Sequence, residues 1–183
     1  MSPPIRTVCM LGLCLAGLMA NSLAQEFSLP DASGVQHSRA AAAGKTLVIE
    51  FTDPDCPFVK KHYEAKKMQA LQAKVKAEGG LWHSIYSGKV AEDKPAKSIG
   101  SQASAILFDP TMKVAQAYGA KKVPFVVVIR PDGHKVYSGP VDNDRGWGKI
   151  MPGTRNHLEE SLDSMKAGTA APTPSKVYGC SIR

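Results

Sequence analysis

Cysteine is scarce in this sequence, which has only four cysteines among 183 residues. No two of them stand in the C-x-x-C spacing, because the residue three positions after Cys56 is Val59. This absence excludes the dithiol site in which one short turn forms and breaks its own disulfide. Any disulfide chemistry at Cys56 therefore needs a cysteine far along the chain or one from another molecule.

Long runs of positive charge are also missing. Lys and Arg outnumber Asp and Glu by 23 to 16, but the basic residues are scattered and gather only in pairs such as Lys60-Lys61. Segments that bind nucleic acid usually form a basic patch, often with interleaved aromatic residues. The sequence therefore predicts no nucleic-acid partner.

The N-terminal apolar run covers residues 8–20, which is too short to cross a bilayer comfortably. Arg6 precedes this run, and Ser22-Leu23-Ala24 follows it with the small residues of a signal-peptidase site. We predict that residues 1–24 are a signal peptide cleaved after Ala24. The protein is then exported, periplasmic or secreted, and keeps no stable membrane span. An uncleaved membrane anchor is the alternative.

Cleavage would leave two cysteines, Cys56 and Cys180, in an oxidising compartment where they can form one disulfide. The remaining chain is long enough for one domain with its own core. We expect this domain over residues 25–168. A Pro/Thr-rich tail over residues 169–183, extended and mobile, then carries Cys180.

Strand and helix patterns alternate through the predicted domain. The expected strands cover residues 27–30, 35–37, 46–52, 81–86, 105–108, 125–129 and 134–137. The expected helices cover residues 57–79 with a kink near 64–67, 111–118, and 158–165 with Thr154 as N-cap and Gly168 as stop. Residues 90–102 stay ambiguous between helix and loop. This order predicts an α/β fold with a mixed sheet that opens on a hairpin.

Cys56 lies between the buried strand at 46–52 and the helix that Pro57 begins. A thiol at this turn faces unpaired backbone N–H groups and the positive end of the helix dipole, and both favour the reactive thiolate. Lys60 and Lys61 add positive charge one turn later, whereas two nearby aspartates oppose it. The polar, proline-rich surroundings favour a reactive thiol over an inert core cysteine.

Three motifs follow one another in a recognisable order. The first is Phe51-Thr52-Asp53-Pro54-Asp55-Cys56-Pro57-Phe58-Val59, the second is the segment from Tyr118-Gly119 to Val123-Pro124, and the third is the apolar strand 125–129 with Pro131-Asp132-Gly133. Together they resemble the thioredoxin superfamily, most closely its exported TlpA-like and AhpC/TSA-type redoxins, over residues 26–167. The resemblance implies a thioredoxin-like fold, a mixed central β-sheet flanked by helices with an N-terminal β-hairpin extension.

The resemblance also implies roles at the reacting sulfur. Cys56 would be the reactive cysteine, and Glu50, six residues earlier, the buried acid that moves protons for it. The alternative for Glu50 is a glutamate at the strand end that reaches solvent. Pro124 would be a cis-proline that packs beside the sulfur.

Three further residues would contact the substrate by the same resemblance. Pro57 and Phe58 start the helix next to the sulfur. The backbone of Val123 would pair with a substrate chain, as in strand addition.

The sequence departs from two related groups. Asp53 and Ile49 stand where peroxiredoxins carry Thr or Ser and Pro, which argues against their type of peroxide reduction. Lys60 stands where copper-assembly proteins of the Sco type carry their second thiolate, which removes a soft copper ligand. We therefore expect no metal and no other cofactor.

Cys180 has three alternative interpretations. It resolves a mixed disulfide or sulfenic acid on Cys56, it forms a static structural disulfide, or it stays unpaired. Tyr178-Gly179 before it favours a turn-like approach, and this tail together with residues 57–63 looks like one redoxin subgroup.

The favoured function is thiol–disulfide exchange at Cys56, with a protein or small-molecule thiol or disulfide as substrate and an external reductant or oxidant. An atypical thiol peroxidase and a non-catalytic redoxin that handles a metal or binds a partner are the alternatives.

The sequence also leads to expectations for two further side chains near this site. We expect His62 to lie at the surface or partly packed, and Trp147 to anchor its glycine-rich loop or to cap the site.

Overall fold

The computed structural model of the chain describes residues 22–93 and 99–183. Residues 1–21 of the predicted signal peptide and part of the ambiguous segment 90–102 therefore lie outside the described residues. Within the described ranges, no helix is both long and apolar enough to cross a membrane.

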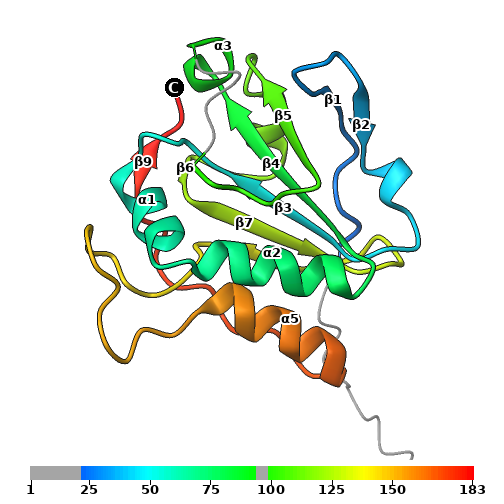
Figure 1. Cartoon of the computed structure of the whole chain (residues 1–183). Coiled ribbons are helices and arrows are strands. Elements are labelled where there is room, and N and C mark those ends of the chain that lie inside the picture. Colours follow the sequence, from blue (N-terminus) through cyan, green and yellow to red (C-terminus); the bar gives the residue numbers. More distant parts are fainter. Residues whose placement is uncertain (1–21, 94–98) are drawn as a thin grey trace, which may run out of the picture.

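Strands and helices alternate in the predicted order (Figure 1). The strands are β1 (Ser28–Pro30), β2 (Gln36–Ser38), β3 (Leu47–Phe51), β4 (Leu81–Ser87), β5 (Ala105–Asp109), β6 (Lys122–Val123), β7 (Phe125–Ile129), β8 (Lys135–Gly139) and β9 (Cys180–Ser181). The helices are the 3-10 turn η1 (Ala40–Ala42), α1 (Pro57–Glu64), α2 (Lys67–Ala77), α3 (Lys89–Asp93), α4 (Lys113–Ala117) and α5 (His157–Ala167). The predicted hairpin is present, since β1 pairs antiparallel with β2.

The central sheet is mixed, in the order β5-β4-β3-β7-β8. β3 lies in the middle, parallel to β4 and antiparallel to β7, so that Val48 stands opposite both Trp82 and Val128. Every residue of β3 and β7 is buried, which explains why both strands read as continuous apolar runs. The prediction of an α/β fold with a mixed sheet is confirmed.

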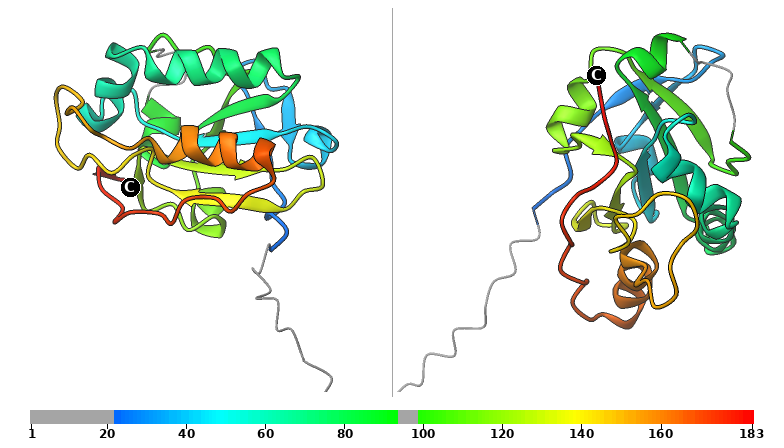
Figure 2. Two further views of the ribbon diagram at one scale, coloured as in Figure 1. Left: turned by 90° about the horizontal axis from the view of Figure 1, so that it is seen from below. Right: turned by 90° about the vertical axis from the view of Figure 1, so that its left-hand side faces the viewer.

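The two faces of the sheet are covered by different elements (Figures 1 and 2). Side chains alternate along a strand, so neighbouring residues of β3 point to opposite faces. Glu50 points toward α1, and Phe51 points to the other face, where its ring lies 6.1 Å from that of Tyr118 after α4. α2 and α5 lie side by side on the face of Glu50, joined by the ion pair of Lys74 and Asp163.

The predicted helix 57–79 is two helices rather than one kinked helix. Pro57 occupies the first turn of α1, as expected, but Lys66 adopts a left-handed φ of 57° between α1 and α2. A left-handed residue cannot continue a right-handed helix, so the chain changes direction there. α1 is thereby a separate two-turn helix that follows directly after Cys56, its N-cap residue.

The start of the last helix also differs from the prediction. Asn156, not Thr154, is the N-cap of α5, and its side-chain oxygen accepts the N–H of Glu159 at 3.0 Å. Gly168 ends the helix with a left-handed φ of 66°, as predicted.

The tail is extended, as the sequence predicts, and it packs along the domain. Residues 169–179 are extended without regular structure, but the chain runs back along the domain from α5 to the end of the sheet near α1 (Figure 2). There β9 pairs antiparallel with β6. Neither of these two short strands was predicted, because two-residue strands leave no periodic pattern.

Candidate active site

Cys56 is the N-cap residue of α1. Its carbonyl oxygen accepts the N–H groups of Val59 and Lys60 at 3.0 and 2.9 Å, which start the helix. Its own N–H donates to the carbonyl oxygen of Asp53 at 3.1 Å, which closes the turn after β3. The sulfur therefore lies at the positive end of the helix dipole, where a thiolate is stabilised. Only 2% of the residue is exposed.

Cys56 and Cys180 are joined by a disulfide. Their Cα atoms are 6.0 Å apart, although 124 positions separate them in the sequence. This spacing is typical of disulfides and needs no displacement of either backbone. The structure thus places the two sulfurs together, which is the arrangement that both the resolving and the structural interpretation require.

The segment before β7 forms the other side of the disulfide. The peptide bond between Val123 and Pro124 is cis, as predicted. The carbonyl oxygen of Val123 lies 3.6 Å from the Cys56 sulfur. Two of the predicted site residues are therefore next to the sulfur, and the backbone of Val123 is already paired with Cys180.

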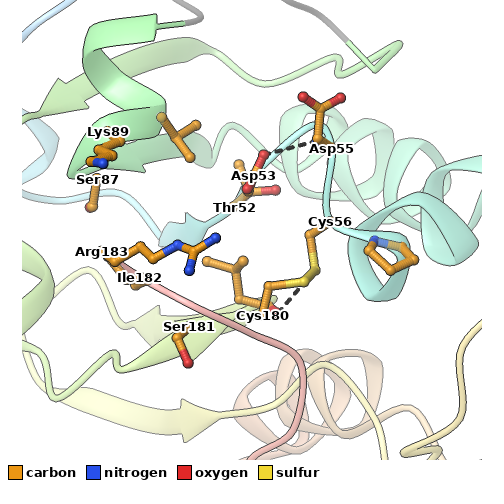
Figure 3. Close-up of a pocket in the computed structure, with 13 residues that line it drawn as sticks. Thr52, Asp53, Asp55, Cys56, Ser87, Lys89, Cys180, Ser181, Ile182 and Arg183 are labelled. Atoms are coloured by element: carbon orange, nitrogen blue, oxygen red, sulfur yellow. Dashed lines mark hydrogen bonds between the residues drawn. A yellow bond between two sulfur atoms is a disulfide. The ribbon is translucent and has the colours of Figure 1, made fainter.

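A cavity of about 490 Å³ opens beside the disulfide (Figure 3). The strand-to-helix turn supplies Asp53 and Asp55 to its wall, and the region around α3 supplies Lys89. Residues of the tail beyond Cys180 line the opposite side. Mixed charge and moderate size suit a polar or peptide-like partner better than a large apolar ligand.

Glu50 is fully buried beneath α1, which excludes the alternative that it reaches solvent. Its carboxylate accepts hydrogen bonds from the Tyr63 hydroxyl at 2.8 Å, from the Trp82 indole N–H at 2.9 Å and from the Ser84 hydroxyl at 3.1 Å. Burial raises the pKa of Glu50 above its ordinary value, and these hydrogen bonds offset part of the rise. Glu50 is thus suited to hold a proton at a pH where an exposed glutamate would lose it.

The two lysines expected to assist Cys56 are engaged elsewhere. Lys61 is buried and donates to the carbonyl oxygens of Asp144 and Gly146 at 2.6 and 2.9 Å, which ties α1 to the loop after β8. Lys60 lies 3.8 Å from the Asp55 carboxylate in an exposed ion pair. Adjacent residues on a helix point about 100° apart, and the sequence alone did not show which way each side chain turns.

A buried polar cluster formed by His62, Tyr178 and Asp142 holds the tail against α1. The Tyr178 hydroxyl donates to Asp142 at 2.5 Å and accepts from the Nε2 atom of His62 at 3.2 Å. The expectation that His62 lies at the surface or is partly packed is wrong, because only 1% of it is exposed. Sequence reasoning missed Tyr178 and Asp142 as site residues. The one available signal was an aromatic residue within a polar, proline-rich tail.

Burial of this cluster leads to a prediction about acid stability. Burial lowers the pKa of His62 from 6.5 to about 3. Since the folded value is depressed, the imidazole contributes stability above pH 6.5 that is lost as the pH falls toward 3. We expect His62→Gln to flatten the fall in unfolding free energy across this window by up to about 1.4 kcal/mol per pH unit. Urea denaturation at a series of pH values measures the slope.

The matched control for this variant is His134→Gln, at the turn between β7 and β8 and outside the cluster. An equal change of slope in both variants would show that burial of His62 is not responsible. Gln was chosen because its amide N–H can still donate to the Tyr178 hydroxyl.

Trp147 neither caps the site nor anchors its loop, contrary to both expectations. Its exposed fraction is 76%. The loop is held instead by Lys61 from below and by Asp144, whose carboxylate accepts the N–H groups of Gly146 and Met151 at 3.0 and 3.1 Å.

No group of three or more His, Cys, Asp or Glu side chains with metal-binding geometry occurs among residues 22–93 and 99–183.

The phenyl ring of Phe58, a predicted substrate contact, packs against the ring of Tyr178 with 5.8 Å between centroids. Pro57 remains exposed at the start of α1. Of the predicted site residues, Cys56, Cys180, Val123 and Pro124 come together at one end of the sheet, with Phe58 beneath the tail.

Comparison with known proteins places this chain in a family. Residues 20–138 match the AhpC/TSA family, whereas none of the curated proteins matches the chain. The structure is similar to an uncharacterized conserved protein from Geobacillus kaustophilus, with 26% identity, a TM-score of 0.73, and coverage of 89% of this chain and 90% of that one. A hypothetical protein from Sinorhizobium meliloti 1021 gives 24% identity, a TM-score of 0.68, and coverage of 88% and 92%.

A third similar structure has a biochemical name. It is the thioredoxin domain of a thiol-disulfide oxidoreductase from Bacteroides vulgatus, with 16% identity, a TM-score of 0.52, and coverage of 64% of this chain and 86% of that one. At this identity the likeness supports the fold, which is thioredoxin-like as predicted. Because the family match covers more than half of the sequence, the chain belongs to the AhpC/TSA family, a redoxin branch of the thioredoxin superfamily.

Proposed function

We propose that this protein is a thiol–disulfide oxidoreductase that reacts through Cys56 and uses Cys180 as its resolving cysteine. The observation that carries the proposal is the Cys56–Cys180 disulfide at the N-terminus of α1, beside Val123 and Pro124. The family and the thioredoxin-like fold support the same chemistry.

In the first step the Cys56 thiolate attacks one sulfur of a substrate disulfide. A bond forms between these two sulfurs, the substrate S–S bond breaks, and the second substrate sulfur leaves as a thiolate that takes up a proton. In the second step the Cys180 thiolate attacks the Cys56 sulfur and releases the first substrate sulfur. The substrate gains two electrons, and an external dithiol must reduce the protein again.

Three parts of the site serve these steps. The N-terminal N–H groups of α1 stabilise the Cys56 thiolate both as nucleophile and as leaving group. Glu50, whose pKa burial raises, would accept and return a proton during exchange at the thiols. Pro57, Phe58 and the backbone of Val123 form the surface against which the substrate lies. Cys180 approaches the sulfur from the same side as Val123.

Stepwise thiol release tests the proposal. Cys9 and Cys14, within the predicted signal peptide, are first replaced by serine in every variant. The reduced chain, given dithiobis-nitrobenzoate, should release two nitrothiolates per molecule and end as the Cys56–Cys180 disulfide. Cys180→Ser should release one and keep a mixed disulfide on Cys56. Cys56→Ser should react at least about tenfold more slowly, because a thiol without helix assistance is only a few per cent thiolate at neutral pH.

Mass spectrometry of the products locates each adduct. Equal rates in Cys56→Ser and Cys180→Ser, or an adduct that persists in the reduced parent chain, would overturn the assignment of roles. A fast stoichiometric sulfenic acid on Cys56 with hydrogen peroxide, combined with slow disulfide exchange, would favour the peroxidase alternative instead.

Export is part of the proposal and rests on the signal-peptide pattern of residues 1–24. An exported redox protein meets thiols and disulfides of other exported proteins, which fits an exchange reaction. N-terminal sequencing of the protein from the producing cells should give Gln25 as the first residue.

A further inference from the structure

The segment that carries Cys180 is bound to the domain as an added strand. β9 runs antiparallel to β6, with Cys180 opposite Val123 and Ser181 opposite Lys122. The N–H of Ile182 then donates to the carbonyl oxygen of Lys121 at 3.1 Å. β6 pairs with no other strand in the described part of the chain. Its edge thus holds one extended segment, and the chain's own tail occupies it.

Gly179 fits this edge because it has no side chain. Its φ of 106° belongs to the left-handed region that other residues rarely adopt. A Cβ built on it would overlap the carbonyl oxygen of Val123 and lie 2.8 Å from the carbonyl carbon. The carbonyl group of Val123 therefore leaves no room for a side chain at the residue before the cysteine, so only glycine fits there.

Tyr178 fills a pocket that is built for a phenol. Its ring packs against Phe58, and the Lys61 ammonium lies 5.0 Å from the ring centroid. The hydroxyl is held by Asp142 and His62, both almost fully buried. A hydroxyl-binding pair beneath an aromatic slot, with a cation over the ring, selects tyrosine over smaller or purely apolar side chains.

We infer that this site binds a polypeptide disulfide whose reacting cysteine follows tyrosine and glycine in an extended segment. The inference rests on the proposed exchange at Cys56. The tail shows which sequence the site accepts. Its Cys180 pairs with the edge of β6 while its Tyr178 fills the pocket formed by Phe58, Asp142 and His62. Substrate and tail occupy the same edge in turn. The substrate segment pairs with β6 while its sulfur bonds to Cys56, and the returning tail displaces it as Cys180 attacks.

The test uses the reduced full-length chain with Cys9, Cys14 and Cys180 replaced by serine. The probe is a peptide of residues 176–183, KVYGCSIR, whose cysteine carries nitrothiobenzoate. Attack by Cys56 releases the coloured thiolate. Matched peptides carry alanine in place of glycine or of tyrosine, and N-acetylcysteine with the same cap is the small probe. We expect the parent peptide to react at least about tenfold faster than each alanine peptide, a difference of about 1.4 kcal/mol.

A second variant tests whether the tail occupies the same edge. Gly179→Ala in the same chain should expel the tail and speed the reaction of the parent peptide several-fold. Gly34→Ala is the matched control, since Gly34 also has a positive φ, of 85°, but lies in the β1–β2 turn, where an added Cβ would meet nothing within 4 Å. It should leave the rate unchanged.

The outcomes separate this inference from the proposed function. Equal rates for all three peptides and the small probe, all at Cys56, would overturn the sequence preference but leave the exchange reaction standing. If Gly179→Ala does not speed the reaction of the parent peptide, the claim that tail and substrate bind the same edge of β6 is overturned. No reaction with any probe would overturn the proposed function itself.

Discussion

Reduction of the Cys56–Cys180 disulfide lowers the free energy of unfolding by up to about 5 kcal/mol. The bond closes a loop of 124 positions, and the chain-entropy model attributes its stabilisation to the restricted unfolded state. For a chain of this length the expected fall in the melting temperature is about 10–20 °C. Thermal and urea denaturation, followed by circular dichroism with and without reductant, measure the change.

Cys180→Ser is the matched control for this experiment. It should show the lowered stability without reductant and no further loss when reductant is added. Equal melting temperatures for the oxidised and reduced parent chain would contradict the prediction.

The turn that carries Cys56 is the part of the site that the sequence predicts best. A buried apolar strand ends, a proline opens a helix, and both signals lie within a few residues of the cysteine. The same holds for Pro124, because the order of short motifs around it resembles the thioredoxin superfamily. Signals of this kind depend on local backbone preferences, so they can be recognised in the sequence without knowing the tertiary contacts.

The contacts of the tail depend instead on residues distant in sequence. Tyr178 reaches Asp142 and His62, which lie 36 and 116 positions away. An Ala/Pro/Thr-rich composition predicts an extended chain correctly, but it says nothing about what the chain packs against. The sequence therefore predicts the extended backbone of the tail but not the surface on which it packs.

The sequence predicts a kink near residues 64–67, but it predicts neither the full break at Lys66 nor the direction of Lys61. Lysine has a good helix propensity, and nothing in its chemistry favours the left-handed φ that it adopts. The left-handed φ lies at the junction where the chain turns from α1 into α2. Lys61 lies near Cys56 in sequence, yet the loop after β8 offers it two carbonyl oxygens and decides its direction.

Glu50→Gln gains stability relative to the parent chain as the pH rises. Burial raises the pKa of Glu50 above 4.5, so its contribution to stability is fully present below pH 4.5 and is lost as the pH rises through the folded value. Glutamine stays neutral and does not share this loss. The difference between variant and parent should therefore grow by up to about 1.4 kcal/mol per pH unit in that window and level off above it.

Urea denaturation from acidic to alkaline pH tests this difference. Glu64→Gln, exposed on α1, is the matched control for loss of a carboxylate. A second measurement uses Trp82, whose indole N–H donates to Glu50. In a Trp147→Phe background Trp82 is the only tryptophan, because the chain has two. Its emission should then titrate with Glu50, and Glu50→Gln should abolish that titration.

If Glu50 exchanges protons with Cys56, Glu50→Gln should also change how the reactivity of Cys56 depends on pH. In the reduced chain with Cys180→Ser, the alkylation rate of Cys56 reports its thiolate fraction at each pH. A buried carboxylate below α1 disfavours a second negative charge nearby, so the parent profile should change slope as Glu50 ionises. In Glu50→Gln the profile should follow a single ionisation shifted toward lower pH. An unchanged profile would remove Glu50 from the chemistry and leave it as the buried acceptor of Trp82, Tyr63 and Ser84.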